Sequence, residues 1–328
     1  MSARKWFFGV CVATLCAASL SAQSASSKTK PYVASKTAWG DPDLQGTYTN
    51  KDENGIPFER PSRFSGKSNA DVDDEELKEL IAERSKAAVD RAPGIGGAET
   101  GAGPTHWYEN YGAKNSRAWL VVDPPEGTVP PLTAEANARA AERARLRAGH
   151  GPADSPEDRS LYDRCITRGI PGSMTPAIYG NSYEIIQSPG WVAIRYEMVH
   201  ETRLIPLDAR PHLKSKIESY MGDARAHFDG NTLVVETTNF KAASAYRGAS
   251  EHLKLIERFK PIGPKTVEWS VTLDDPHTWA RPWTFAMNLT KDSSQPIFEY
   301  GCHEGNYGLR DILSAERAAD KAARSGAE

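Results

Sequence analysis

Residues 253–273 read LKLIERFKPIGPKTVEWSVTL, and this stretch decides the fold class. In residues 253–260, Leu253, Leu255 and Phe259 occupy alternate positions together with Glu257, and from Val267 to Leu273 apolar side chains recur at every second position. A turn rich in Pro and Gly separates the two runs. Because the side chains of a strand point alternately to the two faces of a sheet, this period indicates two half-buried strands. The sequence therefore predicts an antiparallel strand pair.

Similar β-type runs lie on both sides of this pair. They are Ser182–Ser188, Trp191–Met198, Glu201–Pro206, Ala226–Phe228, Thr232–Thr238, Trp283–Leu289 and Pro296–Tyr300. Short turns join many of them, and Asp229-Gly230 suits a two-residue type I′ turn. No βαβ pattern occurs between them, which argues against a parallel sheet. We predict a mainly β fold, an antiparallel up-and-down, lipocalin-like barrel, with a sandwich as the alternative that periodicity leaves open.

Such a barrel removes exposed sheet edges and encloses a cavity that holds one small ligand. We place it at residues 158–308, after an irregular, partly helical extension at residues 39–157. Helical patterns run from Asp71 to Ala92 and from Thr133 to Gly149. A third runs from Leu309 to Ala323, within a C-terminal helix and tail at residues 309–328.

The first 22 residues have the pattern of a cleaved signal peptide. Arg4 and Lys5 precede an apolar run from Trp6 to Ala18, and small residues at 19–22 offer a cleavage point. The run is too short to span a bilayer, which takes about 20 helical residues. We expect a secreted or periplasmic protein without stable membrane insertion, whose residues 23–38 form a disordered linker.

The charge of the chain excludes one class of partner. Its 40 Lys and Arg against 43 Asp and Glu give a formal charge of −3, so a strongly basic nucleic-acid binder is excluded. We expect no nucleic-acid partner. The chain also lacks the G-x-S-x-G elbow, the Walker A motif and a Rossmann fingerprint that follows a strand.

Four cysteines divide into two pairs. Cys11 and Cys16 would leave with the signal peptide, so the mature chain keeps Cys165 and Cys302. In an oxidising compartment an even pair favours a disulfide. The alternative is a catalytic thiol at Cys302, beside His303.

Four motifs carry a resemblance to a known family. They are DRSLYDRCITRG at residues 158–169, HETR at 200–203, MGDAR at 221–225 and CHEGNY at 302–307. Together they resemble an uncharacterised family of secreted bacterial proteins, abundant in acidobacteria and some proteobacteria. The resemblance implies secretion and a common fold, and it implies no activity.

The densest polar cluster follows Tyr300. His303 is the predicted principal acid or base, and Glu304 and Tyr307 are its predicted catalytic neighbours. Strand alternation would put His200 on one face with Tyr196, where it could meet His303 across a cavity. Neither HExxH nor CxxC is present, so we predict no metal and no other cofactor.

Four further side chains are candidates for ligand binding. Arg164 and Arg168 flank Cys165, and arginine forks suit an anionic group. Tyr179 and Asn306 complete the predicted substrate-binding set. The leading hypothesis is a cofactor-free lyase, isomerase or hydrolase that uses His-centred acid/base chemistry on a small, partly apolar molecule. The alternative is a lipocalin-like small-molecule-binding protein without catalysis, and a third is an envelope structural protein.

Overall fold

The computed structural model describes residues 32–90, 115–177, 179–208, 210–294 and 296–325, and at residues 87–90 and 200 it describes only the backbone. The predicted signal peptide and residues 23–31 of the predicted linker lie outside these ranges.

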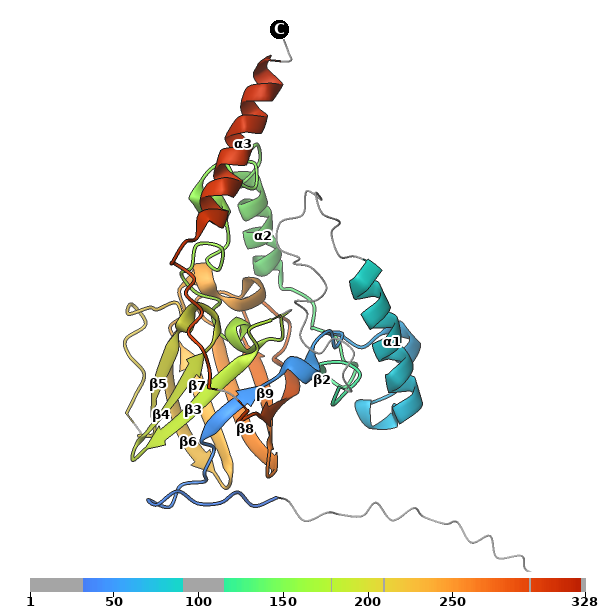
Figure 1. Cartoon of the computed structure of the whole chain (residues 1–328), viewed down its shortest axis with the longest axis vertical. Coiled ribbons are helices and arrows are strands. Elements are labelled where there is room, and N and C mark those ends of the chain that lie inside the picture. Colours follow the sequence, from blue (N-terminus) through green and yellow to red (C-terminus); the bar gives the residue numbers. More distant parts are fainter. Residues whose placement is uncertain (1–31, 91–114, 178, 209, 295, 326–328) are drawn as a thin grey trace, which may run out of the picture. The chain divides into compact units, whose positions relative to one another are not determined.

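The structure confirms a mainly β, antiparallel barrel (Figure 1). Nine strands follow the order β5-β4-β3-β1-β10-β9-β8-β7-β6, and β2 pairs with β10 beside this path. β5 and β6, at the two ends of the order, lie next to each other, so the sheet is nearly closed. The strands are β1 (Gly46–Thr49), β2 (Val121–Asp123), β3 (Ser182–Ser188), β4 (Trp191–Tyr196), β5 (Thr202–Pro206), β6 (Asp223–Asp229), β7 (Thr232–Thr238), β8 (Lys254–Gly263), β9 (Thr266–Asp274) and β10 (Trp283–Lys291).

The strand pair predicted from residues 253–273 is β8 and β9. Leu255 pairs with Leu273 and Phe259 pairs with Trp269, which brings the apolar positions of both strands to one face. These four side chains are fully buried, whereas neighbouring positions such as Arg258 and Lys260 are exposed. Every second residue of these strands is therefore buried, as the alternating sequence pattern predicts.

Large side chains pack against one another inside the barrel. The Trp269 and Phe285 rings meet edge to face with centroids 5.7 Å apart, and Tyr183 and Tyr196 do so at 6.2 Å. All four are at most 1% exposed. Buried apolar side chains of all the barrel strands form one cluster in the interior, where we predicted a ligand cavity.

One ion pair is buried in this interior. Arg203 of β5 donates to a carboxylate oxygen of Glu257 on β8 at 2.7 Å, and the two side chains are 3% and 0% exposed. The Thr237 hydroxyl and Trp269 Nε1 satisfy further polar atoms of the pair, at 3.0 and 3.2 Å. Burial by itself would lower the pKa of Arg203, but the Glu257 carboxylate reverses this and raises that pKa. The Arg203 guanidinium therefore stays charged, and its contact with Glu257 ties β5 to β8.

The sheet begins earlier in the chain than predicted. β1 and β2 fall in residues 39–157, which we assigned to an extension outside the barrel. β1 lies between β3 and β10, with Tyr48 paired to Tyr183 on one side and to Lys291 on the other. The barrel at residues 158–308 is therefore incomplete without the preceding region.

Two other details of the strand prediction are corrected. Residues 296–300 form no strand, because β10 is already paired on both sides and Pro296 has no N–H to donate. The β6–β7 turn consists of Gly230 and Asn231, since Asp229 itself pairs with Thr232.

The three predicted helices are present as α1 (Asp74–Asp90), α2 (Ala134–Leu146) and α3 (Tyr307–Ser325). The Thr133 side chain caps α2 by accepting from the Ala136 N–H at 3.0 Å. No helix among the described residues combines the length and apolar character needed to cross a membrane. The 3-10 helices are Lys51–Glu53, Ser62–Phe64, Asn69–Asp71, Pro156–Asp158, Gly172–Met174, Met198–His200, Ala242–Ser244 and Tyr246–Gly248.

Candidate functional site

Two long loops meet at one end of the barrel. Because neighbouring strands are antiparallel, the start of β3, the end of β7 and the start of β8 lie at the same end. Residues 158–181 lead into β3, and residues 239–253 connect β7 to β8. A third segment, residues 296–306, leads from the region after β10 to α3. These three segments build the hollows described below.

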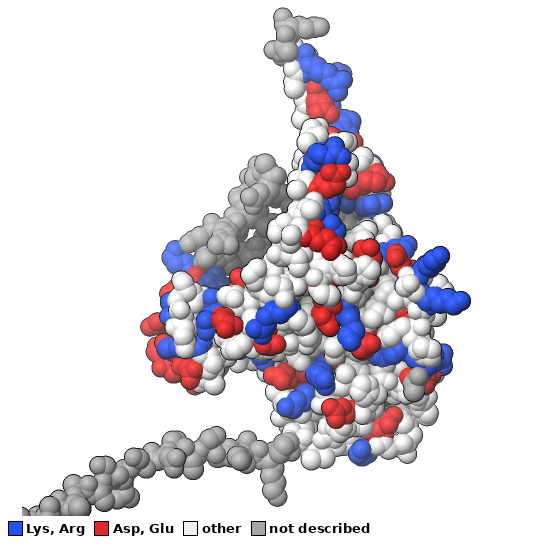
Figure 2. Space-filling model, turned by 180° about the vertical axis from the view of Figure 1, so that it is seen from behind, with Lys and Arg blue, Asp and Glu red and all other residues white. Residues whose placement is uncertain are grey.

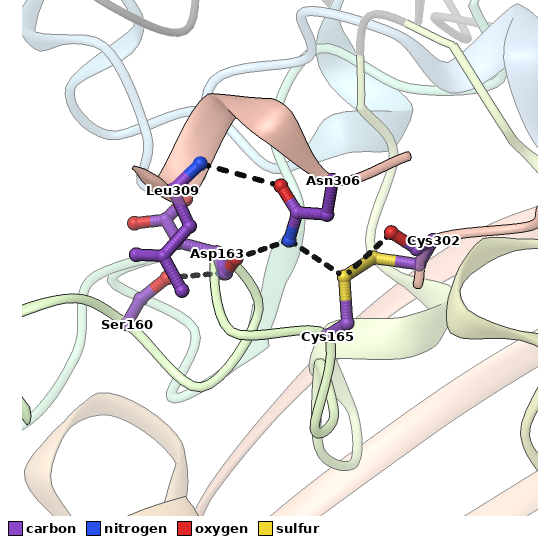
Figure 3. Close-up of a disulfide and its surroundings, with 6 residues drawn as sticks. All are labelled: Ser160, Asp163, Cys165, Cys302, Asn306 and Leu309. Atoms are coloured by element: carbon purple, nitrogen blue, oxygen red, sulfur yellow. Dashed lines mark hydrogen bonds between the residues drawn. A yellow bond between two sulfur atoms is a disulfide. The ribbon is translucent and has the colours of Figure 1, made fainter. Parts of the chain in front are cut away.

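A disulfide joins the first of these segments to the third. Cys165 and Cys302 are bonded at 2.09 Å with their Cα atoms 5.7 Å apart, which confirms the predicted bridge (Figure 3). Cys302 is therefore not a free thiol, and the alternative prediction of a catalytic thiol at this position is wrong. Cys165 has a φ of 54°, a left-handed conformation that is uncommon outside glycine, so the loop turns sharply at the bridge.

Asn306 reinforces this junction (Figure 3). Its amide nitrogen donates to the Asp163 carbonyl and to Cys165 Sγ, both at 3.2 Å, while its Oδ1 accepts from the Leu309 N–H at 3.3 Å. Asn306 therefore caps the first turn of α3 and holds that helix against the loop. We predicted Asn306 as a substrate-binding residue; it does line a hollow, but its amide is already engaged.

The larger hollow, which we call the arginine hollow, has a volume of about 510 Å³. Among the described residues that line it, two are arginines, two are tyrosines, and none is acidic or a histidine. Several hydroxyl groups and small residues complete the wall. The lining is Ser160, Leu161, Tyr162, Thr167, Arg168, Gly169, Gly172, Thr175, Pro176, Ala243, Ser244, Ala245, Tyr246 and Arg247.

The two arginines of this hollow rest on aromatic rings. The Arg168 guanidinium lies 5.2 Å from the centroid of Tyr162, and that of Arg247 lies 4.2 Å from the centroid of Phe58. Within the part of the chain that the structure describes, neither guanidinium forms an ion pair. Cation–π contacts orient them without neutralising their charge, so both remain available to an anion.

Many charges elsewhere on the described part of the chain lie beside a charge of opposite sign. Figure 2 shows Lys and Arg interspersed with Asp and Glu over the face it presents. Arg210, for example, also lies over a ring, 5.7 Å from the centroid of Trp191, but it donates to Asp208 at 2.6 Å. Arg168 and Arg247 differ from it in lacking a carboxylate.

A second hollow, which we call the disulfide hollow, measures about 410 Å³ and shares Tyr162 with the first. Three tyrosines, the disulfide and the start of α3 form most of its wall. The lining is Tyr162, Asp163, Cys165, Tyr179, Tyr300, Gly301, Cys302, Glu304, Gly305, Asn306, Gly308, Leu309 and Ile312.

The three tyrosines of the disulfide hollow are joined through their phenol groups. Tyr162 and Tyr179 hydrogen-bond to each other and to Tyr300. Burial raises the pKa of Tyr179, and the hydrogen bond with Tyr300 raises it further. Burial also raises the pKa of Tyr162, against the opposing charge of Arg168. The Tyr162 and Tyr179 phenols therefore stay protonated at neutral pH and act as neutral hydrogen-bonding groups.

The structure separates the residues predicted to be catalytic. Glu304 lines the disulfide hollow, whereas His303 is exposed and lines neither hollow. Tyr307 is 61% exposed and stacks under Arg310, whose guanidinium lies 4.7 Å from the ring centroid. β4 ends at Tyr196, and His200 follows in a 3-10 turn in which Val199 has a φ of 59°. Strand alternation therefore does not relate His200 to Tyr196, and the His200 side chain lies outside the described part of the structure.

The residues predicted to bind substrate are partly brought together. Arg168 lines the arginine hollow and Tyr179 the disulfide hollow. Arg164 lines neither; it is half-buried and lies 3.8 Å from a Glu157 carboxylate oxygen. Sequence reasoning missed Arg247 and Tyr246, because their loop joins the site only through the fold and the string Tyr246-Arg247-Gly248 carries no motif.

No group of three or more His, Cys, Asp and Glu among the described residues is arranged to hold a metal ion. Comparison with models of protein families, with curated proteins and with solved structures found no match. The family resemblance of the four motifs therefore remains a prediction, and the function has to be argued from the site itself.

Proposed function

We propose that this chain is a small-molecule-binding protein whose ligand presents an anionic group to the arginine hollow. The observation that carries the proposal is the pair Arg168 and Arg247, two guanidinium groups on a hollow with no acidic residue among its described lining. An arginine fork donates two parallel hydrogen bonds to a carboxylate, sulfonate or phosphate. Tyr162 and Tyr246 in the same wall suit a partly apolar ligand body.

The proposed location is a secreted or periplasmic one. The Cys165–Cys302 disulfide fits an oxidising compartment, as does the signal-peptide pattern of the first 22 residues. Of the predicted lipocalin-like barrel the proposal keeps only the up-and-down strand order, because the proposed ligand lies over the end of the barrel and not inside it.

The His-centred enzyme has less support. An acid or base must reach the reacting atom directly or through one water. No histidine is among the described residues that line either hollow, and His303 is exposed. Binding without catalysis is therefore the function we favour.

The proposal is tested with naphthalene sulfonate, an aromatic anion, and with neutral naphthalenemethanol, by titration calorimetry. We expect the wild-type protein to prefer the anion. The double variant Arg168→Gln with Arg247→Gln should lower its affinity for the anion by about ten- to a hundredfold, because charge-assisted hydrogen bonds are lost. Its affinity for the neutral alcohol should not change.

Arg210→Gln is the matched control, since it removes a guanidinium that also lies over a ring but already has a carboxylate partner. It should bind the anion like the wild type. If the double variant binds naphthalene sulfonate as tightly as the wild type, the arginine hollow is not an anion site and the proposal fails.

A further inference from the structure

The two hollows share a wall but differ in the sign of their charges. The arginine hollow is lined by two guanidinium groups and, among the described residues, by no acid. The disulfide hollow is lined by the carboxylates of Asp163 and Glu304 and, in the same described part of the chain, by no Lys, Arg or His. Tyr162 belongs to both walls. A ligand that extends past Tyr162 therefore meets positive charge on one side and negative charge on the other.

Of the two carboxylates, Glu304 is the one left for a ligand. Asp163 already has a partner, since its Oδ2 lies 3.0 Å from Arg159 Nη2. Glu304 is exposed and forms no ion pair within the described residues. It sits two positions beyond Cys302, so the disulfide fixes the backbone of the segment that carries it.

The aromatic groups of the disulfide hollow also suit a cation. The Tyr179 and Tyr300 rings lie with centroids 6.4 Å apart at 34°, and the Tyr162 phenol hydrogen-bonds to both. The face of an aromatic ring and a neutral phenol oxygen both attract an ammonium group. Three such rings beside an unpaired carboxylate resemble the composition of known ammonium-binding pockets.

We propose that the disulfide hollow binds an ammonium group of the same ligand whose anionic group enters the arginine hollow. The ligand is then a soluble organic zwitterion with its two charges separated by a short apolar chain. An α-amino acid fits less well, because its charges are on one carbon while the ligand must extend past the Tyr162 side chain. This inference rests on the proposed function, because it requires an anion at Arg168.

Three probes of equal chain length separate the contribution of the anionic group from that of the ammonium group. They are hexanoate, hexylammonium and ω-aminohexanoate, each titrated by calorimetry or ligand-observed NMR. We expect the wild-type protein to bind ω-aminohexanoate about three- to tenfold more tightly than hexanoate, as one partly exposed ion pair and cation–π contacts would give. Glu304→Gln should abolish this preference and leave the affinity for hexanoate unchanged.

Asp311→Asn is the matched control. It removes a nearby negative charge from α3 that is paired with Arg310 at 3.1 Å and does not line the hollow. It should keep the preference for ω-aminohexanoate. Tyr179→Phe should keep it as well, whereas Tyr179→Leu, which removes the ring, should reduce it.

The outcomes distinguish this inference from the proposed function. Equal affinity of the wild type for hexanoate and ω-aminohexanoate, or a full preference in Glu304→Gln, overturns the zwitterion and leaves the anion site standing. Unchanged hexanoate binding in Arg168→Gln with Arg247→Gln overturns both. Cosedimentation of the protein with phosphatidylethanolamine vesicles would contradict a soluble ligand.

Discussion

Arg203 inside the barrel and Arg168 at its end have opposite surroundings. Arg203 is 3% exposed and donates to Glu257 at 2.7 Å, with Thr237 as a further partner. Arg168 is half-buried, rests on the Tyr162 ring and has no acidic neighbour in its hollow among the described residues. The fold gives the buried Arg203 a counterion and leaves Arg168, at the barrel end, without one among the described residues. An arginine therefore ties strands together in one region, and in the other we propose that it binds a ligand.

The largest effect should come from breaking the buried pair. Glu257→Ala leaves the Arg203 guanidinium in the interior without its counterion, and we expect the free energy of unfolding to fall by about 3–5 kcal/mol. Urea denaturation measures the change. Arg203→Met with Glu257→Leu removes both charges and should cost much less. If Glu257→Ala is as stable as that double variant, the pair is not a buried charge pair in solution.

Loss of the disulfide should have the next largest effect on stability. It should loosen the loops at the end of the barrel and leave the barrel interior intact. Cys165→Ser with Cys302→Ser should lower the free energy of unfolding by about 2–4 kcal/mol, because the unfolded chain is no longer constrained. Hydrogen exchange should become faster at residues 296–312, while β8 and β9 remain protected. Equal loss of protection in those two strands would show that the barrel depends on the bridge.

The smallest effect on stability should come from removing the two arginines of the arginine hollow. Arg168→Gln with Arg247→Gln should lower the free energy of unfolding by only about 1 kcal/mol, since each side chain loses a cation–π contact but no ionic partner. Thermal unfolding followed by circular dichroism checks this. A destabilisation approaching that of Glu257→Ala would mean that these arginines support the fold instead of a ligand.

Local pattern predicted the strands that lie close together in the chain. β3, β7, β8, β9 and β10 begin and end within a few residues of the predicted runs, because hairpin neighbours share one alternating pattern. β1 was missed, since its four residues are too few to show a period and both of its partners come much later in the sequence. Alternation also failed at Met198–His200, where the chain turns out of the strand.

The site was less predictable than the fold. Arg168, Glu304 and the disulfide were selected from the polar clusters around the two cysteines, and Tyr179 from the turn-rich residues 176–181. Arg247 and the link between Tyr162 and Tyr300 depend on which loops meet at one end of the barrel. His303 drew attention because it stands between Cys302 and Glu304, but adjacency in the sequence does not bring it into a hollow.

The position of β1 has a consequence for how the chain folds. β1 is among the first described segments to be synthesised, yet it pairs with β10 near the other end of the chain and with β3. Loop-closure entropy delays such distant contacts, so the hairpins of β3–β4 and β8–β9 form earlier. Until β1 inserts, β3 and β10 each present a row of unpaired backbone groups that another chain can join. The folding chain therefore passes through a period of aggregation risk that ends only when β1, the first described strand, pairs with β10, the last.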